Sequence, residues 1–302
     1  MKRFLFVLSL LLVQPSFVQP SFAEEISAQS SSVRWNSISE TVEGILAQKQ
    51  VSGVQVVVQH KGKTVYNKAF GHRDIESKDP LEKDSVYRFY SMTKPITSVA
   101  VMMLVEEGKI DLYGPVAQYL PELKGLTIHK AKRKGVQTVT VHQLLTHTSG
   151  MTYGFFGNTP VDKMYQRVQP LYSSNNSEMM TKLAPLPLLY EPGTQWHYSI
   201  ATDVLGALVE RVSGQSLGTF FQDRIFDPLE MTDTTFQLRL TQTDRFTTSY
   251  TKQLKVVDAY NQSTFALPNR MESGGGGLLS TGEDYLHFCQ MLLNLGEWNG
   301  KR

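Results

Sequence analysis

The chain has a single cysteine, Cys289, among its 302 residues, so no disulfide can form within it. Its stability must come from a hydrophobic core, and 41% apolar residues are enough to build one. We expect Cys289 to be an ordinary buried residue of that core. The seven histidines are scattered, and none forms the H-E-x-x-H pair of a zinc-binding helix. We therefore expect neither a metal nor another cofactor.

The chain also lacks an excess of charge. Its formal net charge is +2, and without Lys2 and Arg3 the 28 acidic residues are matched by an equal number of basic ones. Nucleic-acid binding needs clustered lysine and arginine for the phosphate backbone. The balance excludes that class of partner and favours a small-molecule substrate, while it leaves the oligomeric state open.

No apolar run reaches the roughly 20 residues that a membrane-spanning helix needs. The run from Phe4 to Val13 follows Lys2 and Arg3, and Ser21-Phe22-Ala23 offers small residues at the −3 and −1 positions of a cleavage site. We predict a signal peptide over residues 1–23, a mature domain over residues 24–302, and a periplasmic or secreted location. An uncleaved membrane anchor is the alternative, but the prolines of two Gln-Pro-Ser-Phe repeats interrupt it.

Apolar periodicity and breaker residues outline the elements. The interval 109–195 is rich in glycine and proline and predicts short helices and loops that line a cleft, with Asn175-Asn176-Ser177 as a solvated loop. The patterns elsewhere predict a helix over residues 33–48, a hairpin of strands 54–60 and 64–70, a helix over 93–107 buried on nearly all sides, and helices over 201–212, 218–226 and 282–295.

Ser91 and Lys94 stand at the start of the apolar helix, in the pattern S-x-x-K. Pro95 is tolerated only in a first helical turn, so it fixes the helix start close to Ser91. Residues three apart share a helix face, which brings the Lys94 ammonium to the Ser91 hydroxyl. Serine is a weak nucleophile until a neighbouring base takes its proton. The first-turn N–H groups can hold an oxyanion, so the segment predicts acyl-transfer chemistry, with an N-cap serine and a surface lysine as the alternative.

The sequence resembles the serine β-lactamase and penicillin-recognising superfamily, in particular its class C-like branch with the family VIII carboxylesterases. The matching segments occur in the family's order and span most of the chain. They are Tyr87-Arg88-Phe89-Tyr90-Ser91-Met92-Thr93-Lys94, Leu144-Leu145-Thr146-His147-Thr148-Ser149-Gly150-Met151, Glu191-Pro192-Gly193 with Trp196-His197-Tyr198-Ser199, Phe226-Asp227-Pro228-Leu229-Glu230-Met231 and Gly274-Gly275-Gly276-Gly277-Leu278-Leu279-Ser280-Thr281.

The resemblance implies an α+β fold, with an antiparallel sheet flanked by helices and a mostly helical lobe. It also implies that Ser91 is acylated, that Lys94 is its base or proton relay, and that Tyr198 belongs to the second motif and shares the proton transfer. Ile200 stands where β-lactamases usually carry an asparagine that grips an amide. This difference favours hydrolysis of short-chain carboxylic esters over a β-lactamase or D-alanyl carboxypeptidase activity.

The family's third motif (K-T-G, H-x-G or W-x-G) is missing after the glycine-rich stretch. We expect the chain to be a C-terminally truncated fragment that lacks the later strands of the sheet and is itself inactive if those strands complete the site. A function from another class, a penicillin- or peptidoglycan-binding module without catalysis, is the alternative. A mere binder, however, has no need of both Lys94 and Tyr198.

Two further residues imitate catalytic groups. Ser216 lies in Gly214-Gln215-Ser216-Leu217-Gly218, which matches the G-x-S-x-G elbow of α/β-hydrolases. That elbow needs a strand before it and a histidine in the right place after it, whereas Ser216 follows a helical pattern, so we interpret it as a helix-start residue. His147 lies where a helix ends at Ser-Gly, and a structural or capping role suits it better than catalysis.

Overall fold

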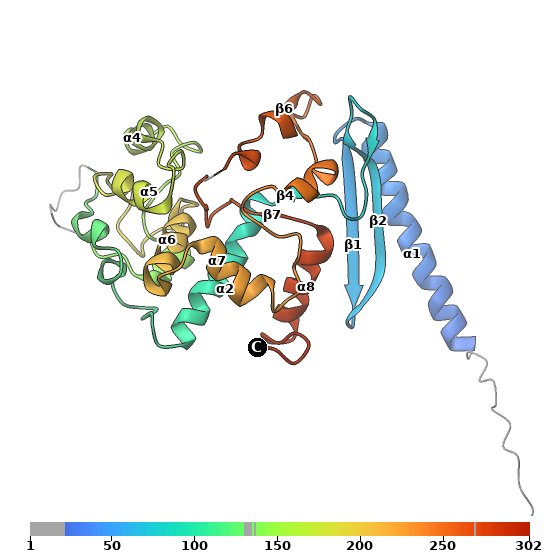
Figure 1. Ribbon diagram of the computed structural model, residues 1–302, viewed down its shortest axis with the longest axis horizontal. Helices are drawn as coiled ribbons and strands as arrows, with labels where there is room; N and C mark the ends of the chain where they lie inside the picture. The colour runs from blue at the N-terminus through green and yellow to red at the C-terminus, as the bar shows by residue number, and fades with distance from the viewer. Residues whose placement is uncertain (1–21, 130–134, 136, 269) are drawn as a thin grey trace, which may run out of the picture.

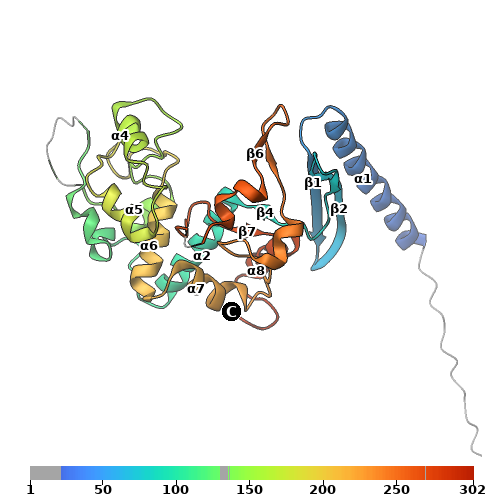
Figure 2. The ribbon, with the colours of Figure 1, turned by 45° about the horizontal axis from the view of Figure 1, so that its top comes forward.

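A hairpin with a helix on each side forms one part of the molecule. The computed structural model describes residues 22–129, 135, 137–268 and 270–302. Strands β1 (Gly53–His60) and β2 (Lys63–Asp74) pair antiparallel, and β3 (Asp79–Pro80) adds to β2. Helix α1 (Phe22–Ala47) packs on β2 and α8 (Gly282–Leu293) contacts β1, so helices flank the hairpin in both views of the ribbon (Figures 1 and 2).

The hairpin confirms the strands expected from the alternating apolar residues, and its turn at Lys61 and Gly62 has positive φ angles of 49° and 75°. The first helix begins earlier than the pattern at 33–48 predicts, because it extends back to Phe22. The expected signal peptide lies outside the described residues except for its last two positions. No described helix has the length and apolar character to cross a bilayer.

The helical lobe is built around α6 (Ala201–Ser213), which contacts α2, α3, α5 and α7. Every side chain from Ala201 to Val209 is buried. The other helices around this core are α2 (Thr93–Glu106), α3 (Val141–Leu145), α4 (Pro160–Val168), α5 (Asn176–Leu183) and α7 (Leu217–Phe221), which continues as a π-helical turn (Gln222–Phe226). The lobe lies at the far end of the molecule from the hairpin (Figure 1).

Three expectations about burial were wrong. Helix α2 has one buried face, but Met102 on another face is 44% exposed, so α6 and not α2 is the helix enclosed on nearly all sides. Asn175 and Asn176 do not form a solvated loop, because Asn175 caps α5 through Glu178 N–H and Asn176 is buried, donating to the Glu272 carbonyl at 3.1 Å. Cys289 is only partly buried.

Short strands join the hairpin region to the lobe. Strand β4 (Tyr87–Arg88) pairs antiparallel with β7 (Leu279–Ser280), and β5 (Ser249–Tyr250) pairs with β6 (Val256–Asp258). The 3₁₀ turns that connect the elements are Tyr90–Met92, Val116–Gln118, Pro121–Gly125, Leu240–Arg245, Tyr260–Gln262 and Thr264–Ala266. The β4–β7 pair lies in the middle of the molecule and brings residues from both ends of the chain next to α2 (Figure 2).

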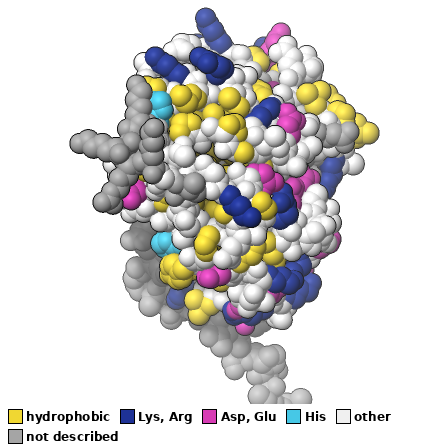
Figure 3. Space-filling view, turned by 90° about the vertical axis from the view of Figure 1, so that its left-hand side faces the viewer, with side chains coloured by type: hydrophobic (Ala, Val, Ile, Leu, Met, Phe, Trp, Pro, Cys, Tyr) yellow, Lys and Arg dark blue, Asp and Glu magenta, His cyan; other side chains and the backbone are white. Residues whose placement is uncertain are grey.

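The face of the helical lobe that Figure 3 shows carries basic, acidic and apolar side chains interspersed. No continuous basic field covers it.

Candidate active site

Ser91 is held at the junction of β4 and α2. The pairing of Arg88 with Leu279 leads into the turn Tyr90–Met92, which continues directly as α2. Tyr90 has a φ of 42°, in the left-handed region, a conformation that costs a non-glycine residue on the order of 1 kcal/mol or more. The turn leaves Ser91 exposed while Thr93 just behind it is fully buried.

The three predicted side chains come together. Ser91 Oγ lies 2.6 Å from Tyr198 OH, and Lys94 Nζ donates to Ser91 Oγ at 3.2 Å. The helical spacing predicts the contact between Lys94 and Ser91. The contact between Ser91 and Tyr198 joins residues 107 positions apart in the chain. The expected proximity of the three side chains is therefore observed, because a serine hydroxyl, a lysine ammonium and a tyrosine phenol share one hydrogen-bonded cluster.

Lys94 is fixed by more than Ser91. Its ammonium donates to the Gly275 carbonyl at 2.6 Å and lies 4.6 Å from the centre of the Tyr198 ring and 5.4 Å from that of Tyr153. A carbonyl and two π faces compensate the cation for lost hydration. The ammonium is thus held beside Ser91 Oγ and against the Tyr198 ring.

The glycine-rich segment after Ser273 lies against the first turns of α2. Thr97 donates to the Gly274 carbonyl at 2.7 Å, and the Leu278 N–H donates to Thr93 Oγ1 at 3.1 Å. A Cβ on Gly274 would meet the Thr202 carbonyl oxygen at 2.8 Å, which real side chains do not tolerate. Glycine at this position allows α2, α6 and the segment to approach one another.

Asp203, in the first turn of α6, is a site residue that the sequence analysis missed. Its fully buried carboxylate accepts hydrogen bonds from Tyr153 OH at 3.1 Å, from the Gly275 N–H at 3.1 Å and from Ser273 Oγ. Burial raises its pKa, and these donors together with the Lys94 charge oppose that effect. A carboxylate directly before the apolar run from Val204 to Val209 was the available signal, because a buried charge needs partners.

The imidazole ring of His147 packs against the ring of Tyr198. Its ring centre lies 4.9 Å from that of Tyr198, and its Nδ1 is 3.4 Å from Ser199 Oγ. Its φ of 55° ends the α3 segment, in agreement with the expected structural role. Burial, the charge of Lys94 and that of His197 lower its pKa to about 4, so the ring is neutral at neutral pH. A neutral imidazole adds no second positive charge beside Lys94.

A cavity of about 770 Å³ opens at Ser91. Tyr153, Phe155 and Phe156 form an aromatic cluster on one side, with ring centres 4.5 to 6.3 Å apart. Ile200 also lines the cavity and is itself 1% exposed, so an apolar side chain occupies the position of the amide-gripping asparagine. The cavity thus presents aromatic and other apolar side chains next to Ser91, together with polar ones farther along its wall.

Ser216 does not form part of this site. It is the N-cap of α7 and accepts a hydrogen bond from the Thr219 N–H at 3.1 Å, which confirms its interpretation as a helix-start residue. The later histidine, His287, contacts the Leu229 carbonyl from within α8. The G-x-S-x-G match therefore has neither a strand before it nor a histidine at Ser216.

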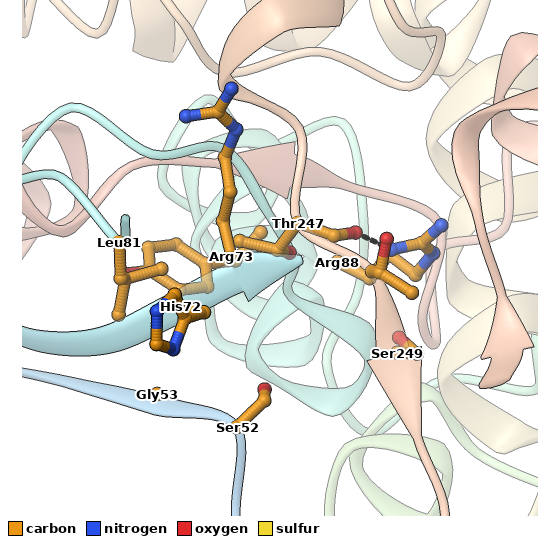
Figure 4. A pocket seen from close by; sticks show the side chains of 10 residues that line it. Ser52, Gly53, His72, Arg73, Leu81, Arg88, Thr247 and Ser249 are labelled. Atoms are coloured by element: carbon orange, nitrogen blue, oxygen red, sulfur yellow. Dashed lines mark hydrogen bonds between the residues drawn. The ribbon is translucent and has the colours of Figure 1, made fainter. Parts of the chain in front are cut away.

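A second, smaller cavity of about 200 Å³ lies between the hairpin and β5, and Figure 4 shows the side chains around it. Arg73 points away from the other labelled residues, whereas Arg88 donates to the Thr247 carbonyl at 2.5 Å. The Arg88 Nε also pairs with Asp258 at 2.6 Å. Through these contacts Arg88 holds β4 against the segment from Thr247 to Asp258. Among the described residues, no group of three or more histidine, cysteine or acidic side chains could hold a metal.

Comparison with known proteins agrees with this geometry. Protein Rv1367c of Mycobacterium tuberculosis (strain ATCC 25618 / H37Rv) is 34% identical over 267 residues, which are 83% of this chain and 65% of that protein. Esterase EstB of Burkholderia gladioli is 29% identical over 88% of this chain and 71% of its own length. The chain thus spans 65% of the length of the first of these relatives.

Similarity in structure extends over almost the whole chain. The solved structure of EstCE1, described as a hydrolase with promiscuous acyltransferase activity, covers 92% of this chain and 76% of its own, with a TM-score of 0.78 and 25% identity. This confirms the expected α+β fold of the β-lactamase and transpeptidase type. A family model described as Beta-lactamase matches residues 38–300. The chain belongs to the Beta-lactamase family.

Proposed function

We propose that the protein is a serine hydrolase that cleaves carboxylic esters of small molecules through an acyl-enzyme intermediate. The observation that carries this proposal is the cluster of Ser91 Oγ, Tyr198 OH and Lys94 Nζ, with contacts of 2.6 and 3.2 Å, at the mouth of an apolar cavity. A nucleophile within hydrogen-bond reach of a proton acceptor is the arrangement that covalent catalysis requires.

In the proposed reaction, Tyr198 acts as a phenolate, and the Lys94 ammonium, 4.6 Å from the centre of that ring, stabilises its negative charge. Ser91 Oγ attacks the ester carbonyl carbon while its proton passes to the phenolate oxygen. N–H groups at the start of α2 stabilise the oxyanion. Collapse of the intermediate expels the alcohol, which takes the proton from Tyr198. Water then attacks the acyl-enzyme by the same proton route and releases the acid.

Ester cleavage is favoured over β-lactam opening by the buried Ile200 and by the aromatic cluster of Tyr153, Phe155 and Phe156. Ile200 cannot form the hydrogen bonds with which an asparagine grips an amide. The aromatic cluster suits an apolar acyl chain. The names of EstB, an esterase, and EstCE1, a hydrolase, support the same reaction class.

Hydrolysis of p-nitrophenyl butyrate and of nitrocefin tests this function. We expect a higher kcat/KM on the ester, loss of activity in Ser91→Ala, and retained activity in the matched control Ser216→Ala. Loss of activity only in the Ser216 variant, or a higher kcat/KM on nitrocefin, would refute the proposal.

A binding module without turnover gives a different result. It would react slowly or not at all with a fluorophosphonate, whereas a hydrolase with an activated Ser91 gains the mass of one phosphonyl group. Intact-mass spectrometry of the protein and of Ser91→Ala separates the two functions.

We also propose export of the protein, based on the charged and apolar pattern of residues 1–23. Cleavage after Ala23 would give a mature N-terminus at Glu24. N-terminal sequencing of the protein recovered from the periplasm or medium tests this, and a retained Met1 would contradict it.

A further inference from the structure

Arg270 lies in the wall of the active-site cavity, and its side chain is fixed on one side only. Its guanidinium carbon lies 3.9 Å from the centre of the Phe265 ring. Its Nη1 donates to the carbonyl oxygens of Phe236 and Gly277, both at 3.1 Å. The stacking and the two carbonyls fix the plane and one edge of the guanidinium.

The other edge of the guanidinium carries Nε and Nη2. Within the described part of the chain, neither Nε nor Nη2 of Arg270 donates a hydrogen bond, and no carboxylate lies within ion-pair distance of this side chain. The charge of Asp258 acts on Arg270 from a distance, but its carboxylate is occupied by Arg88 Nε at 2.6 Å and by Ser263 Oγ at 3.2 Å. Arg270 is therefore a cation without a close counter-ion.

Burial lowers the pKa of Arg270, while Tyr90 and Asp258 oppose this effect. A guanidinium nevertheless stays charged in proteins. A partly desolvated charge without a partner is unfavourable, and an incoming anion would relieve it. The Nε and Nη2 pair forms the fork that a carboxylate binds with two parallel hydrogen bonds.

Arg270 and Ser91 belong to one continuous wall. Phe265, on which Arg270 stacks, has its ring centre 6.2 Å from that of Tyr90, the residue directly before Ser91. Gly277, which accepts from Arg270, follows Gly276, where a Cβ would lie 3.7 Å from the Tyr90 backbone. Both Arg270 and Ser91 line the same cavity. A single small molecule in this cavity can contact both.

We propose that Arg270 binds a carboxylate carried by the substrate, so that the preferred substrates are esters with an apolar part and a separate anionic group. This inference rests on the proposed esterase function and narrows its substrate class. The apolar part packs against the aromatic side chains of the cavity, and the carboxylate forms a bidentate ion pair with Nε and Nη2 of Arg270.

A matched pair of substrates tests this proposal. The 4-nitrophenyl monoester of adipic acid carries a free carboxylate, and its methyl ester has nearly the same shape without the charge. We expect the wild-type protein to prefer the anionic ester in kcat/KM. Arg270→Met should lower kcat/KM for the anionic ester about tenfold to hundredfold, the loss of a charge-assisted bidentate pair, and change that for the neutral ester far less.

Two variants distinguish the bidentate geometry of Arg270 from the effect of positive charge alone. Arg270→Lys keeps the charge but loses the bidentate geometry, so it should recover only part of the preference. Arg167→Met removes an exposed charge from α4 and should leave the preference unchanged. An equal loss for both esters in Arg270→Met, or the same loss of preference in Arg167→Met, would overturn the proposal.

Binding to Ser91→Ala makes the test independent of turnover. Calorimetry should show tighter binding of the anionic ester than of the neutral one, and the difference should disappear in the double variant with Arg270→Met. If the wild-type protein hydrolyses neither ester, the proposed function fails, and the binding measurement still decides the role of Arg270. Equal binding of the two esters, or binding of neither, refutes that role.

Discussion

Replacing Asp203 by alanine removes the one carboxylate that holds the glycine-rich segment against α6. Three donors lose their acceptor: Tyr153 OH, the Gly275 N–H and Ser273 Oγ. Each buried donor left without a partner costs about 1–3 kcal/mol. The two hydroxyl groups can rotate toward other acceptors, whereas the main-chain N–H cannot. We therefore expect the free energy of unfolding to fall by about 2–3 kcal/mol, because the N–H bears the full cost of an unsatisfied donor and the two hydroxyl groups add little.

Asp203→Asn is the matched control. Its amide oxygen still accepts from the Gly275 N–H and Ser273, and its NH₂ group can donate to Tyr153 OH, so we expect a loss of about 1 kcal/mol. The asparagine variant should fold and still be impaired in ester hydrolysis, because it removes the negative charge whose field reaches Lys94.

Urea unfolding at neutral pH, followed by tyrosine and tryptophan fluorescence, measures both changes. A loss below about 1 kcal/mol in Asp203→Ala, or equal losses in the alanine and asparagine variants, would refute the reasoning. A small loss in Asp203→Ala would mean that the three donors find other acceptors. Equal losses in the two variants would mean that an acceptor at this position is unimportant for stability.

Three further predictions concern the surroundings of Ser91. Tyr198→Phe keeps the ring packing but removes the proton carrier, so we expect kcat to fall about 10²- to 10⁴-fold with little change in KM, and a loss below tenfold would contradict its role. The pKa of His147 is lowered from 6.5 to about 4, so the unfolded chain binds its proton first and stability is lost as pH falls through this window. His147→Gln should flatten that dependence in urea unfolding between pH 4 and 7, and an unchanged slope would argue against it. Ser216→Ala should cost about 1 kcal/mol through loss of the α7 cap, and unchanged stability would contradict the capping contact.

Local pattern predicted the parts of the site that lie close together in sequence. The S-x-x-K spacing and Pro95 place Lys94 beside Ser91 because helix geometry alone brings residues three apart together. The alternation of apolar residues predicted the hairpin, and helical periodicity predicted α2, α6 and α7, whereas α3, α4 and α5 were expected only as unspecified short helices. Burial was harder to predict, since α2 and α6 are both apolar and only the packing decides which one the other helices surround.

Contacts between distant segments could not be derived from spacing. Tyr198 was found through its resemblance to a family motif, and nothing in its own neighbourhood sets the 2.6 Å contact with Ser91. Asp203 had a local signal, an acid directly before an apolar run, but its partners Tyr153 and Gly275 lie far away in the chain. Arg270 gave no signal at all, because an unpaired charge can be recognised only when its surroundings are known.

The glycine-rich segment that contacts α2 is synthesised long after α2 itself. Lys94 takes its main-chain acceptor from Gly275, and Thr97 takes one from Gly274. The ribosome adds about 5–20 residues per second, so on the order of ten seconds or more separates the synthesis of Lys94 from that of Gly275. During that interval the nascent chain carries the serine and the lysine without the segment that fixes the ammonium. Lys94 thus gains its main-chain acceptor only when nearly all of this chain has been made.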